Sequence, residues 1–263
     1  MKKYFFIWKS EIMTNLQYVF DFVGSLISYS LLVFIFLNLW NYVYGDPSKL
    51  INGYQMNQMI WYVIITELLW MSLSGRSLCQ RICDDVRTGN VAYNINKPYN
   101  YIGYSLASHL GLVTIRFVMI GVIGFVLGYV FLGEIPSLTL LQGLGVLLSC
   151  VLATIINALL IISIGLISFY IEDANPLYWL YSKVILVIGT LFPVEFFPQV
   201  LQPIIKMSPI YVVSYGPAKL FVDFKMDYFI NILLTQGIYL LLAILICAFI
   251  YSKGVKKLNV NGG

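Results

Sequence analysis

Side chains able to carry out acid–base or nucleophilic chemistry are scarce in this sequence. His109 is the only histidine, and we expect it to be a hydrogen-bonded interfacial residue rather than a base. The sequence contains no phosphate-binding Gly-x-x-x-x-Gly-Lys-Ser/Thr loop and no zinc-type His-Glu-x-x-His motif. The cysteines have no metal-ligand spacing and are expected to be free thiols: Cys79, Cys83, Cys150 and Cys247. We therefore predict no catalytic, cofactor or metal site in the chain.

Two ionisable residues lie inside long apolar stretches, where a charge is costly. Glu67 falls near the middle of residues 58–75, and Arg116 lies well inside residues 104–132. Each is expected to face the interior of a helix bundle or water rather than lipid. Two interpretations stay open: the residues lie on a translocation path, or they form a buried pair with each other. Asn157 is expected to hydrogen-bond across helices as a packing contact.

One long polar segment, residues 76–101, interrupts the apolar first half of the chain. Its charged residues are Arg76, Arg81, Asp84, Asp85, Arg87 and Lys97. Charges and backbone groups cannot be left unpaired in hydrocarbon, so this segment must lie in water or against a soluble partner. A plain solvated loop is the alternative to a surface that a cytosolic partner grips.

The composition indicates a polytopic membrane protein. Hydrophobic residues make up 60% of the 263 residues, charged residues make up 11%, and the mean hydropathy is +0.84. Soluble domains contain about 25% charged residues. We predict an all-α fold with six membrane-spanning helices, at residues 18–44, 58–75, 104–132, 138–170, 177–192 and 228–251.

Two segments outside these spans also have membrane character. Residues 1–16 place apolar side chains at helical spacing, namely Phe5, Trp8, Ile12 and Leu16, which predicts an interfacial amphipathic helix. Lys9 and Glu11 interrupt any signal-peptide core. Residues 193–227 contain five prolines among apolar side chains, which favours a short re-entrant helical hairpin in the outer leaflet.

The distribution of cations predicts the orientation. If the amino terminus is cytosolic, ten lysines and arginines fall on the cytosolic side and four on the outer side. The remaining two, Arg116 and Lys183, lie within or at the edge of spans. This asymmetry favours two cytosolic termini. The net charge of +4 thus reflects the excess of cations on the cytosolic side of the membrane and does not indicate a nucleic-acid partner.

A pair of glycines in the third predicted span has the small-xxx-small spacing of closely packed helices. Gly124 and Gly128 are four residues apart, so they lie on one face of a helix. A subunit interface is one place where such a face is used. Glycine is also more common in membrane helices than in soluble ones.

Three stretches, together with the six-span layout, carry a resemblance to a known family. Residues 84–90 read Asp-Asp-Val-Arg-Thr-Gly-Asn and precede Asn96-Lys97-Pro98. Residues 169–178 contain a Glu-Asp-Ala-Asn-Pro turn. Residues 189–198 contain aromatic side chains interrupted by prolines. They resemble the coupling segment, the turn between spans four and five, and the outer re-entrant segment of type-two ATP-binding-cassette (ABC) transporter permeases. The resemblance covers nearly the whole chain.

The resemblance implies a single exporter transmembrane domain over residues 1–263, with no nucleotide site of its own. Residues implied to contact the ATPase are Asp84, Asp85, Arg87, Gly89, Lys97 and Pro98. Implied partners are two copies of a cytosolic ABC ATPase that holds ATP and Mg, and a second permease, either a related chain or a second copy. The complex would move an amphipathic or hydrophobic drug, peptide or lipid across the cytoplasmic membrane.

Two other classes of function remain as alternatives. An intramembrane lipid-modifying enzyme would need His, Cys or carboxylate groups converging at one depth, and a single histidine argues against it. An ATP-independent channel or importer subunit would lack the nucleotide-hydrolysing partner. Purification with or without such a partner distinguishes these classes.

Overall fold

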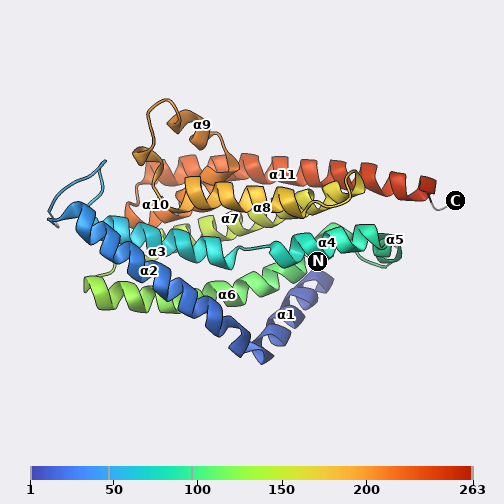
Figure 1. Cartoon of the computed structure of the whole chain (residues 1–263), viewed down its shortest axis with the longest axis horizontal. Helices are drawn as coiled ribbons and strands as arrows, with labels where there is room; N and C mark the ends of the chain where they lie inside the picture. Colours follow the sequence, from blue (N-terminus) through green and yellow to red (C-terminus); the bar gives the residue numbers. More distant parts are fainter. Residues whose placement is uncertain (1, 47, 96, 262–263) are drawn as a thin grey trace.

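The computed structural model describes residues 2–46, 48–95 and 97–261. Their regular secondary structure is helical, apart from one isolated β-bridge between Ile51 and Tyr54. The long helices run side by side along the long axis of the molecule (Figure 1). The predicted all-α class is therefore confirmed.

In the amino-terminal half of the chain, the described residues form six α-helices. They are α1 (Lys2–Gln17), α2 (Val23–Tyr44), α3 (Met56–Ser72), α4 (Arg76–Arg87), α5 (Asn90–Ile95) and α6 (Tyr101–Leu132). A short 3-10 turn, Val19–Phe22, joins α1 to α2. The first helix is thus separate from the first predicted span, and the two meet at an angle (Figure 1).

The carboxy-terminal half alternates long helices with short, irregular ones. Its α-helices are α7 (Leu140–Leu166), α8 (Asn175–Val184), α9 (Gln202–Lys206), α10 (Gly216–Val222) and α11 (Met226–Asn261). Helix α8 continues as a π-helix, Ile185–Thr190, and a second π-helix, Tyr211–Tyr215, leads into α10. Short 3-10 turns occur at Ile167–Phe169 and Val194–Phe196.

Four of the described helices are long and apolar enough to cross a membrane: Val23–Tyr44, Tyr101–Leu132, Leu140–Phe169 and Met226–Lys257. They coincide with four of the six predicted spans. The other two predicted spans are shorter helices. Helix α3 has 17 residues, and α8 has ten residues before its six-residue π-helix. A 17-residue helix rises about 25 Å, somewhat less than the hydrocarbon thickness of about 30 Å.

Helix α3 forms the centre of the bundle, and this explains its polar composition. Residues 59–69 are all buried, among them Trp61 and Glu67. Helices α2, α6 and α10 pack against it. Because protein rather than lipid surrounds α3, it needs neither the length nor the uniform hydropathy of a lipid-exposed span.

The two glycines at small-xxx-small spacing bring helices together within this chain. A Cβ atom at Gly128 would lie 2.3 Å from the ring of Trp61 in α3. A Cβ atom at Gly124 would lie 2.3 Å from the hydroxyl of Tyr29 in α2. The glycine face of α6 therefore packs against α2 and α3 of the same chain. It does not form the subunit interface that the glycine spacing also allowed.

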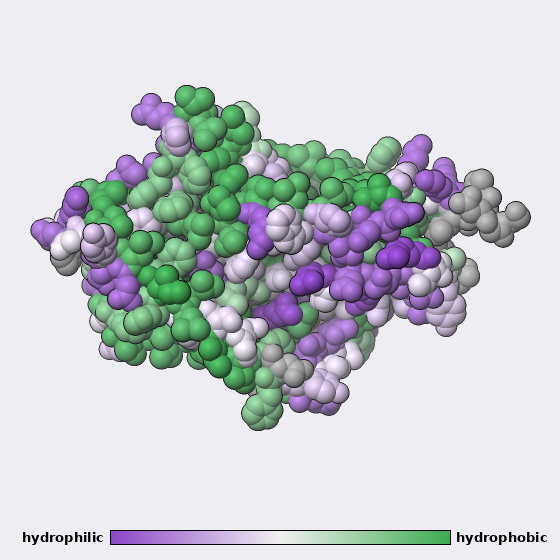
Figure 2. Space-filling view, viewed as in Figure 1, coloured by the Kyte–Doolittle hydropathy of each residue, from purple (hydrophilic) through white to green (hydrophobic). Residues whose placement is uncertain are grey.

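Polar side chains collect at one end of the molecule. The start of α1 and the end of α11 lie toward the same end as α4 and α5 (Figure 1). Figure 2 shows hydrophilic side chains gathered over this end and reaching toward the middle of the visible face, while the other half is mostly hydrophobic. The bundle thus has one strongly polar end.

The segment at 193–227 is broken into short helices and is anchored by one carboxylate. Glu195 accepts hydrogen bonds from the Tyr54 hydroxyl at 3.1 Å and from the Tyr215 hydroxyl at 2.5 Å. These contacts join the loop before α3 to the beginning of the broken segment and to its second π-helix. Apolar side chains stay exposed on it, including Val200 at 81% and Met207 at 79%.

Candidate functional site: the α4–α5 surface and the α3–α4 junction

Helix α4 has one buried apolar face and one exposed charged face. Its buried residues are Leu78, Cys79, Ile82, Cys83 and Val86. Helix α7 approaches closely because it presents Gly165, where a Cβ atom would lie 3.0 Å from the Ile82 side chain. The Ser168 hydroxyl adds a hydrogen bond to the Cys83 sulfur at 3.0 Å. The free face exposes Arg76, Asp84 and Arg87.

A tight turn at the end of α4 directs the chain into α5. The Thr88 hydroxyl donates to the Asp84 carbonyl oxygen at 2.7 Å, and Gly89 has a φ of +74°. Glycine suits this left-handed conformation because it has no Cβ atom. The turn keeps α5 next to α4, so both helices lie at the polar end of the bundle.

The six residues that the resemblance assigns to ATPase contact differ in their surroundings. Asp84, Arg87 and Pro98 are exposed, and Lys97 is half-buried with its ammonium 4.7 Å from the Tyr93 ring centre. Tyr93 and Tyr99 stabilise the charged form of Lys97, and its hydrogen bond to Tyr99 is the largest factor raising its pKa. Asn96, also part of the quoted motif, lies outside the described residues.

Asp85 is tied into the fold rather than left free on the surface. Its carboxylate accepts a hydrogen bond from the Tyr101 hydroxyl at 2.7 Å. Tyr101 is the first residue of α6 and is buried. The Asp85 side chain therefore fastens α4 to the start of α6, whereas Asp84, one residue earlier, is exposed.

Helix α1 is attached to the same polar region, an arrangement that sequence spacing did not indicate. The Lys3 ammonium donates to the Pro98 carbonyl oxygen at 2.6 Å. The backbone N–H of Asn100 donates to the Tyr4 hydroxyl at 3.0 Å. Farther along α1, the Trp8 indole donates to the Thr114 hydroxyl at 3.2 Å. The first helix is thus fixed along the first half of α6.

A polar relay connects α4, α6 and α1. The Arg81 guanidinium donates to the Ser108 hydroxyl at 3.1 Å, and that hydroxyl donates to the Glu11 carboxylate at 2.8 Å. Gly111 lets α1 approach, since a Cβ atom there would lie 2.6 Å from the Glu11 side chain. His109 is buried beside this relay, and its Nε2 atom has no hydrogen-bond partner within the described residues.

The junction between α3 and α4 is held by side chains from three other helices. Helix ends leave backbone carbonyls without partners. Here the Leu73 carbonyl oxygen accepts from the Asn157 amide at 2.9 Å. The Ser74 carbonyl oxygen accepts from Arg116 Nη1 at 3.1 Å, and the Gly75 N–H donates to the Tyr178 hydroxyl at 3.1 Å.

Asn157 is itself positioned from α8. Its side-chain oxygen accepts a hydrogen bond from the Tyr181 hydroxyl at 2.8 Å, and Asn157 is buried at the junction. The predicted cross-helix role of this residue is borne out by these contacts. Its partner is the backbone of the α3–α4 junction, 84 residues earlier in the chain.

Replacing Asn157 should loosen the junction. We expect Asn157→Leu to lower the free energy of unfolding by about 1–3 kcal/mol, since the buried Leu73 carbonyl would lose its donor. Thermal denaturation of the detergent-solubilised protein measures this effect. Asn231→Leu, at an exposed position of α11, is the matched control. Equal melting temperatures for the two variants would contradict the role of Asn157.

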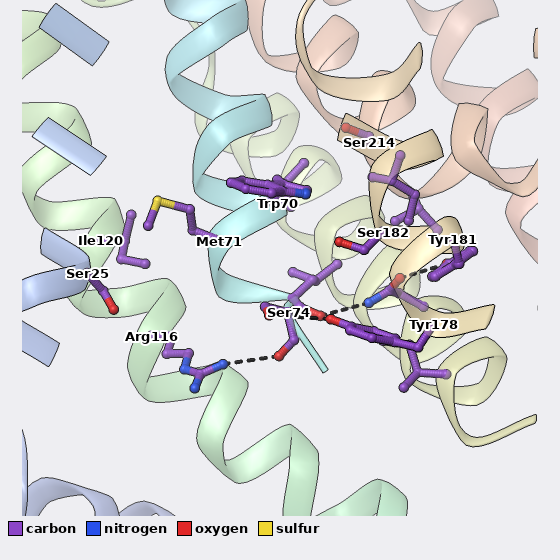
Figure 3. A pocket seen from close by; sticks show the side chains of 16 residues that line it. Ser25, Trp70, Met71, Ser74, Arg116, Ile120, Tyr178, Tyr181, Ser182 and Ser214 are labelled. Carbon is purple, nitrogen blue, oxygen red and sulfur yellow. Dashed lines mark hydrogen bonds between the residues drawn. The ribbon is translucent and has the colours of Figure 1, made fainter. Parts of the chain in front are cut away.

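A cavity of about 250 Å³ opens beside the junction. Residues of α2, α3, the α3–α4 junction, α6, α7, α8 and both π-helices line it (Figure 3): Ser25, Leu69, Trp70, Met71, Leu73, Ser74, Arg116, Ile120, Asn157, Ile161, Tyr178, Tyr181, Ser182, Ile185, Val213 and Ser214. The walls combine apolar side chains with hydroxyls and one cation. The side chains that hold the junction therefore also line the cavity.

The structure does not form the Glu67–Arg116 pair that remained open from the sequence. Among the described residues, the ion pairs are Lys219–Asp223 and Lys225–Asp223. Glu67, on α3, is 1% exposed in the core of the bundle, and its Oε2 atom has no hydrogen-bond partner among the described residues. Arg116 instead donates to the carbonyl oxygen of Ser74, which lies about two helical turns beyond Glu67 in the chain. Of the two residues, Arg116 lines the cavity.

These features define a multi-pass helical membrane protein with one polar end. Comparison with protein families gives the more specific assignment. The family model described as "ABC-2 family transporter protein" matches residues 14–262, and the chain belongs to this family. Members are in general transmembrane permease subunits that lack their own nucleotide-binding site and associate with an ABC ATPase. A comparison with curated proteins finds no significant match.

Proposed function

We propose that the chain is the permease subunit of an ABC exporter that moves an amphipathic or hydrophobic molecule across the cytoplasmic membrane. The observation that carries this proposal is the placement of α4. Its apolar face is seated on α7, and its charged face is free at the polar end. Such a surface suits a soluble partner that pushes on the bundle. Family membership supports the ATPase as that partner.

The proposed complex contains two ATPase subunits and two permeases. ATP and Mg reside on the ATPases, and the second permease is a related chain or a second copy. ATP binding biases the inward and outward states only through contacts that differ between them. In this proposal, Asp84, Arg87, Lys97 and Pro98 supply those contacts, and Gly89 and Asp85 hold the surface in place.

Movement of α4 is passed to the spans through the α3–α4 junction. Arg116, Asn157 and Tyr178 bind this junction from α6, α7 and α8. A push on α4 is thereby shared among several helices, which tilt as packed units. The cavity beside the junction is where we place the cytosolic part of the translocation path.

The proposed membrane placement has six spans and two cytosolic termini. Helix α3 and the α8–π-helix segment complete the four longer spans, with bundle packing compensating for their length. Helix α1 lies along the cytosolic surface with Phe5, Phe6 and Met13 exposed. The segment at 193–227 dips into the outer leaflet, in keeping with its exposed apolar side chains. The excess of cations at the α4–α5 end supports this orientation.

Purification from the native membrane in a mild detergent tests the proposal. We expect a nucleotide-binding protein and a permease to co-purify with the chain, and the complex to hydrolyse ATP. Mass spectrometry of the complex distinguishes a second copy from a related permease. A chain that purifies alone and without ATPase activity would favour a channel or an intramembrane enzyme instead.

A further inference from the structure

Arg116 carries a positive charge into the cavity beside the junction without an acidic partner. Its recorded hydrogen bond, to the Ser74 carbonyl oxygen, uses one nitrogen. A guanidinium has several N–H donors in a planar fork, so further donors remain for another group. The residues that line the cavity include no aspartate or glutamate. Within the described part of the chain, no carboxylate lies within ion-pair distance of Arg116.

Hydroxyl groups line another side of the cavity that holds the cation. Tyr178 and Ser182 line the same space (Figure 3), whereas the Ser214 hydroxyl is occupied by its hydrogen bond to the Gly189 carbonyl oxygen at 2.8 Å. Hydroxyls donate readily to oxyanions, and an arginine fork matches the geometry of a phosphate or a carboxylate. A cationic ligand would meet the uncompensated charge of Arg116 and would be repelled. The electrostatics of the cavity therefore favour an anion.

The remaining wall is apolar and suits a hydrocarbon chain. Leu69, Ile120 and Ile185 contribute aliphatic surface, and Trp70 adds an aromatic ring. A volume of about 250 Å³ exceeds what a single small anion needs. A charged head group next to Arg116 and the first part of a tail along the aliphatic side chains would fill it.

We propose that this cavity binds the anionic head group, a phosphate or a carboxylate, of an amphipathic molecule through Arg116. Binding itself requires no ATPase. The statement that the bound molecule is the cargo rests on the proposed transport function and gives that function its substrate class: amphipathic anions.

The affinity of the purified wild-type chain, with or without co-purifying subunits, for two matched probes tests the charge preference. The probes are 12-bromododecyl phosphate and 12-bromododecyl trimethylammonium, added in a neutral maltoside detergent without nucleotide. Bromine quenches tryptophan fluorescence, and the part of the quenching that W70F removes reports on the cavity. We expect the phosphate probe to bind at least about tenfold more tightly than the ammonium probe. Equal affinities would overturn the proposal.

Substitutions at Arg116 test which group provides the preference. We expect Arg116→Gln to weaken binding of the phosphate probe at least about tenfold. Arg116→Lys keeps the charge but loses the planar fork, so its affinity for the phosphate probe should lie between those of the wild type and Arg116→Gln. Lys183→Gln is the matched control, because Lys183 is exposed on α8 next to Ser182 but does not line the cavity. Unchanged binding by a folded Arg116→Gln variant would overturn the assignment.

Competition with inorganic phosphate separates the two sources of the anion. An amphipathic ligand predicts that dodecyl phosphate displaces the bromine probe far better than inorganic phosphate does. Equal displacement would overturn the amphipathic part of the proposal. Because no nucleotide or transport is involved, a negative result here leaves the permease function intact, and a failed co-purification leaves the binding result intact.

Discussion

Reversing the charges of Asp84 and Arg87 together should reduce ATP-driven transport at least about tenfold while ATP hydrolysis continues. Both side chains are exposed on the free face of α4, where a soluble partner would meet them. Charge reversal places like charges against each other at such a contact, which costs several kcal/mol. Transport and ATPase rates of the reconstituted complex measure the effect. Chain insertion should not change, because neither side chain is buried in the fold.

Two comparisons make this prediction specific to the α4 surface. Lys206→Glu reverses an exposed charge on α9, in the broken segment anchored by Glu195, and should leave coupling unchanged. Asp85→Asn weakens a contact with Tyr101 within the chain and should lower the melting temperature. If ATP hydrolysis still drove transport normally in the variant with both charges reversed, α4 would be excluded as the contact with the ATPase.

Gly128→Ala should destabilise the bundle by about 1–3 kcal/mol through overpacking. The added methyl group would lie 2.3–2.7 Å from three atoms of the Trp61 ring. That ring has little freedom to move, because Trp61 is 1% exposed and its indole N–H donates to the Glu134 carbonyl oxygen at 3.1 Å. Thermal unfolding of the solubilised protein provides the measurement.

Other glycines of the chain supply the control for this prediction. Gly143 and Gly237 lie in α7 and α11, and a Cβ atom at either position would contact no heavy atom within 4 Å. Alanine there should be neutral or stabilising by up to about 1 kcal/mol, because alanine favours helix more than glycine does. If Gly128→Ala matched these two variants, close packing of α6 on α3 would be excluded.

Hydropathy and helix-end signals were enough to predict the long helices. The third predicted span, residues 104–132, corresponds to α6, which ends at Leu132 because Gly133 takes a left-handed φ of +71°. The fourth predicted span, residues 138–170, corresponds to α7 and its terminal 3-10 turn. Both features are local, since a run of apolar residues and a terminal glycine act within one helix.

Contacts between helices could not be predicted in the same way. Glu67 and Arg116 both lie inside apolar stretches, but membrane depth does not determine which way a side chain points. Arg116 faces the α3–α4 junction, whereas Glu67, on α3, is buried in the core of the bundle. The hydrogen bond from Asn157 to the Leu73 carbonyl joins residues 84 positions apart, and no sequence periodicity indicates such a pairing. The candidate site depends on contacts of this long-range kind.

The junction between α3 and α4 shares its side chains with the cavity, and this has a thermodynamic consequence. Arg116, Asn157 and Tyr178 both hold the junction and line the pocket. A ligand that binds these groups must therefore favour some geometries of the junction over others. Linkage is reciprocal: if the ligand changes the equilibrium between two geometries by some factor, that change of geometry alters the ligand's affinity by the same factor. In the proposed transporter, the affinity for the cargo and the affinity of the ATPase for α4 would then be linked by one coupling free energy.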